Sequence, residues 1–574
     1  MNVLVVVVAC AGILLAGYRF YGNFLSKKVF KLDDSRVTPA VEKNDGLDYS
    51  PAPKGMLLGQ HFSAIAAAGP ITGPILAAVM FGWAPALLWI LVGSIFIGGV
   101  HDMGSLVASI RNQAKSITEV IRQHVSLRAW ILFQIFIWIT LVYVIVAFTD
   151  TTASSFVGNI DLGNGEMVTG AGIASSSVLY LLVSVLMGLA MKFGRLKEGL
   201  ATLIFIPLVG VAIWAGQLLP LDLGIADPLM AQKVWGGIIL AYCLVASAVP
   251  MWLVLQPRGA LGGWFLYIAL AVCAIGLIFG GYDIQYPVFM ALQADSQLGS
   301  FWFHMFPVLF ITVACGACSG FHSLVSSGTT SKQLNKESDA KPVAYGAMLL
   351  EALVAVVSVA CVMILKQNDA MIGKSPNFIY AMGIGSFVEL FGIPASLGIS
   401  FGLMAFTTFV YDTLDVCTRL GRYIIEELTG MKGWAGKIIS TVLTAGVPLF
   451  FIFKTSVDAA GNPIPAWKVF WSTFGATNQL LAALALIGVT VWLFSIRTGK
   501  YNRKYLVSLI PAVVMFVMSN WSLISSIYTT LMLGQGMIVV AFISILLVCL
   551  SVMVAVESYI ALRHSSKARP IPAV

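Results

Sequence analysis

The chain has 574 residues, of which 59% are hydrophobic and only 10% are charged, and its mean hydropathy is +0.90. Soluble domains do not have this balance, so we expect an all-α protein that crosses a membrane many times. The net charge of +8 is explained by basic loops on one side of the membrane, so we expect no nucleic acid partner.

Apolar runs long enough to cross the lipid bilayer predict about fifteen transmembrane helices. Lys and Arg concentrate in the loops of one side, which predicts an outside N-terminus and a cytoplasmic C-terminus in the cell's plasma (inner) membrane. The first run lacks the features of a cleaved signal peptide, so we expect it to be retained. The expected spans are 2–24, 56–82, 84–110, 129–157, 172–192, 200–220, 233–255, 260–280, 301–331, 343–366, 395–417, 435–454, 468–494, 505–528 and 534–560.

The second span is interrupted halfway by the sequence GPITGP at 69–74. Two prolines and two glycines in six residues predict a broken helix, with Pro74 at the start of the second half. The free amides and the positive dipole end of that half-helix would lie at the membrane centre, where they could hold a carboxylate. We therefore predict that Gly69, Thr72 and Gly73 bind substrate, and that Gly73→Leu blocks the approach to these amides.

A second break is expected at 246–250 in the seventh span, five spans after the first. Five is odd, so two units of five helices would enter the membrane in opposite directions. This arrangement is the five-plus-five inverted repeat of the LeuT fold, and Ser247 and Trp252 would then line the substrate pocket. The predicted divisions are 1–55 (N-terminal helix and linker), 56–220 (first unit), 233–417 (second unit) and 418–574 (about four extra helices and the tail).

Ionisable residues inside predicted spans are costly and are usually functional. We predict that protons couple to transport through His61, beside the first break, with His322 as the second candidate and Asp102 as an inner relay. Asp150 and Glu351 are further candidates, and a structural role for each acid is an equal alternative.

The ninth span carries the cluster Cys315-Gly-Ala-Cys-Ser-Gly-Phe-His322-Ser. Ser319 and Ser323 could bind substrate or an ion there, or could simply allow close helix packing. The spacing of Cys315, Cys318 and His322 resembles that of metal ligands, but it equally fits ordinary packing, so we expect no metal and no other cofactor.

Two further polar features are expected to be structural. Asp415 lies four residues before Arg419, which favours an ion pair along one helix. Asn478 and Gln479 are expected to join helices by hydrogen bonds. The eight cysteines lie in or at the edges of spans, which argues against a disulfide framework.

Motifs of ATP-binding and catalytic sites are missing from the sequence, including the Walker loop, the H-E-x-x-H pair and the nucleophile elbow. We therefore expect no enzyme, and transport driven by an ion gradient or running downhill.

Several segments resemble the carbon starvation protein A (CstA) family, whose members are implicated in the uptake of peptides or pyruvate with protons under carbon limitation. The resemblance also implies membership of the amino acid–polyamine–organocation superfamily. The family pattern Pro-Arg-Asp-Tyr-Leu is replaced here by Pro-Arg-Gly-Ala-Leu at 257–261, which puts details of gating or coupling in doubt. The motifs that carry the resemblance are GQHFSAIAAAGPITGP (59–74), GGVHDMGSLVASIRN (98–112), ITVACGACSGFHSLVSSGTTSKQ (311–333), AYGAMLLEALVAV (344–356), DTLDVCTRLGRYIIEEL (412–428) and FGATNQLLAALAL (474–486).

The favoured function is therefore secondary import of short peptides coupled to protons. A symporter of pyruvate or another small monocarboxylate is the alternative, because both substrates present a carboxylate to the same half-helix. A third possibility is a nutrient sensor that binds without transport, which the short tail after the last span disfavours. The oligomeric state stays open.

Overall fold

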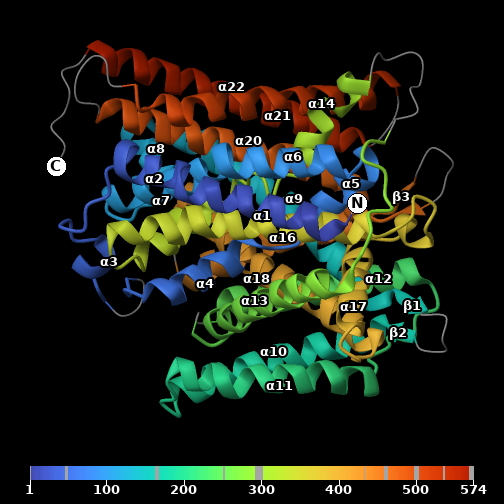
Figure 1. Ribbon diagram of the computed structural model, residues 1–574. Coiled ribbons are helices and arrows are strands. Elements are labelled where there is room, and N and C mark those ends of the chain that lie inside the picture. The colour runs from blue at the N-terminus through green and yellow to red at the C-terminus, as the bar shows by residue number, and fades with distance from the viewer. Residues whose placement is uncertain are drawn as a thin grey trace.

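The computed structural model describes residues 2–45, 49–161, 167–249, 252–290, 301–431, 433–457, 463–496, 503–533 and 537–567. Long helices run side by side through the whole molecule (Figure 1). Strands among these residues form two small antiparallel hairpins, β1–β2 (Asn159–Asp161 and Met167–Thr169) and β3–β4 (Ser456–Val457 and Pro463–Ile464). In Figure 1 both hairpins lie at one end of the bundle and the short helix α8 (Ile117–His124) lies at the other.

Among the described residues, thirteen helices are long and apolar enough to cross a membrane, and one bent pair raises the number to fourteen. The expected fifteen are therefore not confirmed, because the ninth predicted span is interrupted by a non-helical stretch. The thirteen spans contain the helices α1 (Val3–Arg19), α6 and α7 (Trp83–Gly93 and Gly99–Arg111, which together form one span), α9 (Leu127–Val157), α10 (Gly170–Lys192), α11 (Glu198–Leu218), α12 (Pro228–Ala248), α13 (Leu255–Gly280), α16 (Ala347–Met363), α18 (Ala395–Thr429), α19 (Gly433–Phe453), α20 (Ala466–Ser495), α21 (Leu506–Leu533) and α22 (Ile538–Lys567).

Shorter helical segments join or flank these helices. Two of the three described π-helical turns adjoin long helices inside the bundle: η2 (Ser94–Gly98) joins α6 to α7, and η5 (Lys341–Gly346) leads into α16. The remaining segments are α2 (Tyr21–Phe24), η1 (Leu25–Val29), α3 (Pro39–Glu42), η3 (Thr330–Lys332), η4 (Glu337–Asp339), η6 (Ala370–Gly373) and α17 (Pro376–Glu389).

The first predicted break is present, but it lies slightly earlier than expected. Helix α4 (Lys54–Ile65) ends before 66–68, and α5 (Gly69–Phe81) continues at an angle of 49°. Pro70 occupies the second position of α5, where a missing amide hydrogen costs nothing. The expectation that Pro74 begins the second half-helix is wrong, because Pro74 lies inside α5.

The second break is not in the seventh span. Helix α12 ends at Ala248 as an ordinary helix terminus, and α13 begins at Leu255 as a separate helix. Pro250, part of the expected break, lies outside the described residues. The interrupted helix is instead the ninth predicted span, where α14 (Phe301–Thr312) and α15 (Phe321–Gly328) are separated by 313–320.

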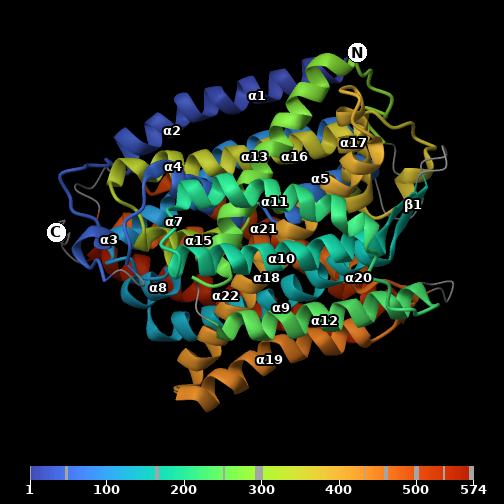
Figure 2. The ribbon, with the colours of Figure 1, turned by 90° about the horizontal axis from the view of Figure 1, so that it is seen from below.

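Both breaks lie inside the bundle, where 66–68 and 313–320 are buried. The pairs α10–α11 and α21–α22 form opposite faces of the molecule (Figure 1), and α1 and α19 lie at opposite edges in the second view (Figure 2). Helix α4 packs against α13, α15, α16 and α18, whereas α5 packs against α6, α14, α16 and α17. The backbone of each break is therefore surrounded by protein, as interrupted helices at membrane depth require.

Candidate functional site

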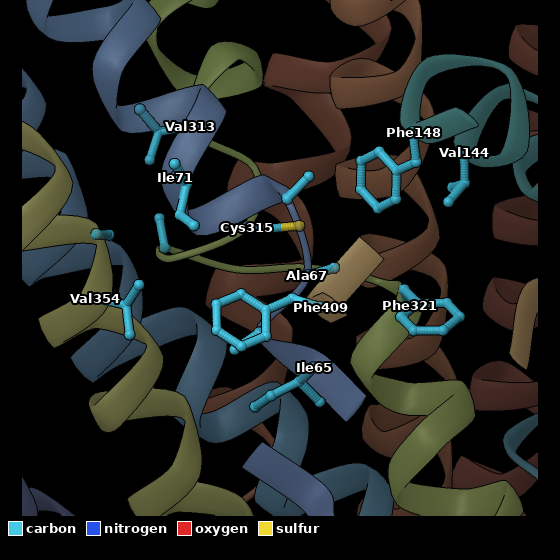
Figure 3. Packing of buried hydrophobic residues seen from close by; sticks show 14 of the residues in the cluster. Ile65, Ala67, Ile71, Val144, Phe148, Val313, Cys315, Phe321, Val354 and Phe409 are labelled. Atoms are coloured by element: carbon cyan, nitrogen blue, oxygen red, sulfur yellow. The ribbon is translucent and has the colours of Figure 1, made fainter. Parts of the chain in front are cut away.

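The two breaks contact each other through glycines of α5. A Cβ atom added at Gly69 would overlap the side chain of Cys315, and one added at Gly73 would overlap the carbonyl oxygen of Thr312. Figure 3 shows Cys315 beside Ile71 at this crossing. The space in front of both glycines is thus filled by the backbone and side chains of the second break. The structure does not support the expectation that Gly73→Leu acts by filling an open approach to the amides.

The N-terminus of α5 nevertheless keeps unused hydrogen-bonding capacity. The amide of Ala68, immediately before the helix, has no hydrogen-bond partner among the described residues. The hydroxyl of Thr72, one turn into α5, is also buried and without a partner in this part of the chain. Unsatisfied buried polar groups are uncommon in folded proteins, and they mark this half-helix end as a place where a polar ligand would be stabilised.

Helix α20 supports the second break with two neighbouring amide side chains. The Oδ1 atom of Asn478 accepts a hydrogen bond from the amide of Phe321 (3.1 Å), the first residue of α15. Its Nδ2 atom donates to Ser319 Oγ (3.0 Å), and Gln479 donates to the carbonyl oxygen of Phe310. These bonds replace those that a continuous helix would make, and they confirm that Asn478 and Gln479 join helices.

A cluster of ionisable side chains from α7, α15 and α16 lies next to the second break. We call His101, Asp102, His322 and Glu351 the histidine–acid cluster, and all four side chains are 0% exposed. His322 lies between the two acids, with Nδ1 2.9 Å from Asp102 Oδ2 and Nε2 3.3 Å from Glu351 Oε2. The other oxygen of Asp102 lies 2.7 Å from His101 Nδ1. Three helices, α7, α15 and α16, therefore contribute side chains to one set of exchangeable protons.

The cluster is connected to the second break and lies within electrostatic range of the first. The amide of Gly316, between α14 and α15, donates to Glu351 Oε1 (3.1 Å). His61 on α4 lies within electrostatic range of Asp102 and His322. Its Nδ1 atom pairs with Thr330 Oγ1 at 2.8 Å, while its Nε2 atom is buried without a partner among the described residues. His61 is therefore close to the cluster but does not contact it.

Two other predicted substrate residues do not reach the breaks. Ser247 donates to the carbonyl oxygen of Leu244 (3.0 Å) near the end of α12. Trp252 packs edge-on against Phe193, 6.0 Å away, and lies under Lys192 at the end of α10. Ser319, by contrast, lies in the second break, and Ser323 in the first turn of α15 donates from Oγ to Gly320 O (2.7 Å).

Asp150 is separate from the cluster and acts as a helix cap. Its Oδ2 atom accepts a hydrogen bond from the amide of Trp467 (2.7 Å) in the first turn of α20. Its Oδ1 atom accepts a second bond from Gln232 Nε2 (2.9 Å) on α12. A carboxylate at a helix N-terminus stabilises the helix, so the geometry favours the structural reading of Asp150.

The thiols of the second break do not form a metal-ligand group with His322 among the described residues. Cys315 Sγ accepts a hydrogen bond from Asn478 (3.6 Å), and both ring nitrogens of His322 face carboxylates. In this structure Cys315 and His322 thus contact different partners.

One charged residue of the interior was not singled out as a site residue from the sequence. Arg258, near the start of α13, is 0% exposed and forms ion pairs with Asp412 and Asp415 of α18, each at 2.6 Å. The expected pair between Asp415 and Arg419 is wrong. Arg419 donates instead to the backbone carbonyl oxygens of Ala246 (2.9 Å) and Val249 (3.0 Å) at the end of α12.

Comparison with known proteins agrees with these features. The family model "Carbon starvation protein CstA" matches residues 2–379 and 370–522. A peptide transporter CstA from Helicobacter pylori is 32% identical over 91% of this chain and 82% of its own length. The pyruvate/proton symporter BtsT of Escherichia coli is 29% identical over 92% of this chain and 82% of its own length.

Among solved structures, a manganese transporter from Eremococcus coleocola aligns with 91% of this chain and 99% of its own chain, with 13% sequence identity and a TM-score of 0.47. This overlap is below the level that defines a shared fold.

Proposed function

The chain belongs to the carbon starvation protein CstA family and is a membrane transporter rather than an enzyme, and on this premise we propose that it imports short peptides together with protons. The observation that carries the proposal is the contact of His322 with Asp102 and Glu351 behind two interrupted helices. The interrupted helices provide a half-helix N-terminus for a substrate carboxylate, and the cluster provides groups that can gain and lose protons.

The physical reason for coupling is the complete burial of the cluster. An uncompensated charge is costly in a low-dielectric interior, so the number of protons held by two acids and their histidine partners depends on what other charge is nearby. A substrate carboxylate at α5 adds one negative charge close to His61 and His322. Protonation of one of these histidines would offset that charge, and release of the substrate inward would favour release of the proton.

We further propose that the core consists of two inverted units, 54–218 and 301–495. Each unit begins with a broken helix, continues with a long helix and a short one, and then has a helix of 31 residues (α9) or 35 residues (α18). Six membrane-crossing helices lie between the two broken helices, and since successive crossings alternate in direction, the two broken helices run in opposite directions. This division places the start of the second unit at α14 rather than at residue 233, and α12 and α13 become an insertion between the units.

This arrangement supports the LeuT-like five-plus-five core and the place in the amino acid–polyamine–organocation superfamily as parts of the proposal. The proposal also includes a plasma-membrane location, an outside N-terminus, a cytoplasmic C-terminus and a role in carbon starvation. The start of α1 and the end of α22 lie at opposite ends of the bundle (Figure 1), in keeping with termini on opposite sides of the membrane.

Pyruvate is the second candidate substrate, because the related BtsT is named as a pyruvate/proton symporter. Counterflow in proteoliposomes, with labelled dipeptide in one set and labelled pyruvate in the other, decides between the two. Exchange of dipeptide and no exchange of pyruvate supports the proposal. The reverse result assigns the chain to the monocarboxylate symporters. If neither substrate is exchanged, the remaining possibility is a nutrient sensor that binds without transport.

A further inference from the structure

A second set of charged side chains is buried on the other side of α4 from the histidine–acid cluster. We call Arg258, Asp412 and Asp415 the Arg258 triad. Arg258 Nε lies 2.6 Å from Asp412 Oδ1, and its second terminal nitrogen lies 2.6 Å from Asp415 Oδ2. His61 and Ser63 are two residues apart, so they point to nearly opposite sides of α4. His61 faces Thr330, whereas Ser63 donates to Asp412 Oδ2 (3.0 Å).

Every nitrogen of the Arg258 guanidinium group has a partner, whereas one carboxylate oxygen of the triad has none among the described residues. Beyond the two ion pairs, Arg258 donates to the carbonyl oxygen of Tyr411 (3.1 Å) and to the hydroxyl of Tyr242. Tyr242 in turn donates to Asp415 Oδ2 (3.1 Å). Asp415 Oδ1 is buried and has no hydrogen-bond partner among the described residues. One carboxylate oxygen is therefore left without a donor in a fully buried position.

The charges of the triad do not balance if both acids are ionised. The guanidinium remains protonated at any physiological pH and contributes one positive charge, and two carboxylates contribute two negative charges. Arg419 offers no compensation, because its guanidinium faces the carbonyl oxygens of Ala246 and Val249. The other titratable groups in electrostatic contact with the triad are phenols and thiols that are ordinarily neutral at pH 7: Tyr180, Tyr242, Cys243, Tyr411 and Cys417.

We infer that the Arg258 triad is a second proton-binding site, which holds one proton on its pair of aspartates and exchanges it when α4 moves. Two carboxylates that share one cation cannot both ionise without leaving a buried negative charge, and a single proton removes that charge. Asp415 Oδ1 is the oxygen free to carry it. Thr408, one turn before Asp412 on α18, adds a buried hydroxyl without a partner among the described residues.

The link to transport is the hydrogen bond from Ser63. Because Ser63 lies on α4 three residues before the first break, a displacement of this half-helix removes a donor from Asp412. Loss of a hydrogen bond to a carboxylate favours its protonated form, so the position of α4 and the proton occupancy of the triad depend on each other. This step rests on the proposed function, because it assumes that α4 moves during a transport cycle.

Infrared difference spectroscopy of the purified protein at neutral pH tests the first half of the inference without any substrate. The spectrum of the wild type minus that of Asp415→Asn should show the carbonyl band of one protonated carboxylic acid, because the variant has lost it. Asp412→Asn should lose the same band, because the remaining aspartate then balances Arg258. The exposed Asp222→Asn serves as the control and should keep the band. Retention of the band in both triad variants would overturn the inference. Size-exclusion profiles identify a variant that fails to fold. If one of the two triad variants does so, the presence or absence of the band in the other decides the test.

The proton-to-substrate ratio, measured from reversal potentials in proteoliposomes, tests the exchange. Asp415→Asn should lower the ratio by one proton relative to wild type. An unchanged ratio in a variant that has lost the infrared band would mean that the proton is permanent, and it would overturn the exchange. If neither dipeptide nor pyruvate is transported, the proposed function fails, whereas the infrared result still decides whether the triad binds a proton.

Discussion

His322 on α15 and Asp102 on α7 are separated by 220 residues in the chain, yet their side chains are in direct contact, with Nδ1 and Oδ2 2.9 Å apart. Glu351 lies on the other side of the same imidazole ring. An imidazole held between two carboxylates can carry a proton without leaving an isolated buried charge, so each acid is tied to the protonation of the ring.

Asp102→Asn should uncouple transport from the proton gradient. The amide keeps the size of the side chain but removes the charge that stabilises protonated His322. We expect labelled substrate to exchange in counterflow while accumulation driven by a pH difference is lost. Asp150→Asn is the matched control, because Asp150 is equally buried but caps α20. It should keep proton-driven accumulation while lowering the free energy of unfolding by about 1–3 kcal/mol. Equal losses of coupling in both variants would contradict this assignment.

His61→Gln should likewise exchange substrate but fail to concentrate it. Glutamine can still bond to Thr330, the partner of His61 Nδ1, but it cannot titrate near physiological pH. The measurement is the ratio of internal to external substrate in proteoliposomes with an imposed pH difference. If the variant concentrates substrate as wild type does, His61 is not a proton carrier, and the same assay on His322→Gln then tests the ring that lies between the two acids.

Gly73→Leu should disturb folding before it disturbs substrate binding. A side chain at this position would overlap the carbonyl oxygen of Thr312, which belongs to the backbone of α14 and cannot rotate away. Overpacking of this kind costs about 1–3 kcal/mol or more, so we expect a lower melting temperature in detergent and less monodisperse protein. Gly55→Leu, at a helical position with no atom within 4 Å of the added Cβ, is the control and should melt as wild type does. A stable Gly73→Leu protein would show that the contact of the two breaks can open at little cost.

The orientation of the bundle can be tested on either side of α11. Single cysteines at Lys197 and Asp222, both exposed, should differ in reactivity toward an impermeant thiol reagent added to intact cells. We expect Asp222→Cys to react and Lys197→Cys to stay unlabelled until the cells are opened, in a background without native cysteines. The opposite pattern would reverse the predicted topology.

The first interruption was predictable because its cause is local. Gly69 and Pro70 disfavour the continuation of a helix through this point, so the sequence located the bend to within a few residues, although Pro74 itself is accommodated inside α5. The second interruption lies in 313–320, which contains no proline. It is held open by Asn478, whose side chain bonds to Ser319 across 159 residues of sequence. Its local signal, Gly316 (φ +88°) and Gly320, is weaker than a proline, and the proline near the end of α12 drew the prediction to the wrong helix.

The site was predicted in its parts but not in its connections. Intramembrane charge drew attention to Asp102, His322 and Glu351, because such residues are rarely tolerated without a partner, and the structure places His322 between the two acids. Which residues become partners depends on how the helices pack, and the sequence does not contain that information locally. Asp415 illustrates the limit: its neighbour along the helix, Arg419, turns to α12, and its partner is Arg258 from α13.

The crossing of the two interrupted helices sets a rule for sequence variation in this family. A Cβ atom at position 69 would occupy the volume of the Cys315 side chain, so the two positions share a space that fits only one side chain. A relative with alanine at the position of Gly69 should therefore have glycine at the position of Cys315, and the double exchange should be tolerated where Gly69→Ala alone is not. Substitutions at one of these positions should therefore depend on the residue at the other, so that the pair co-varies across the family.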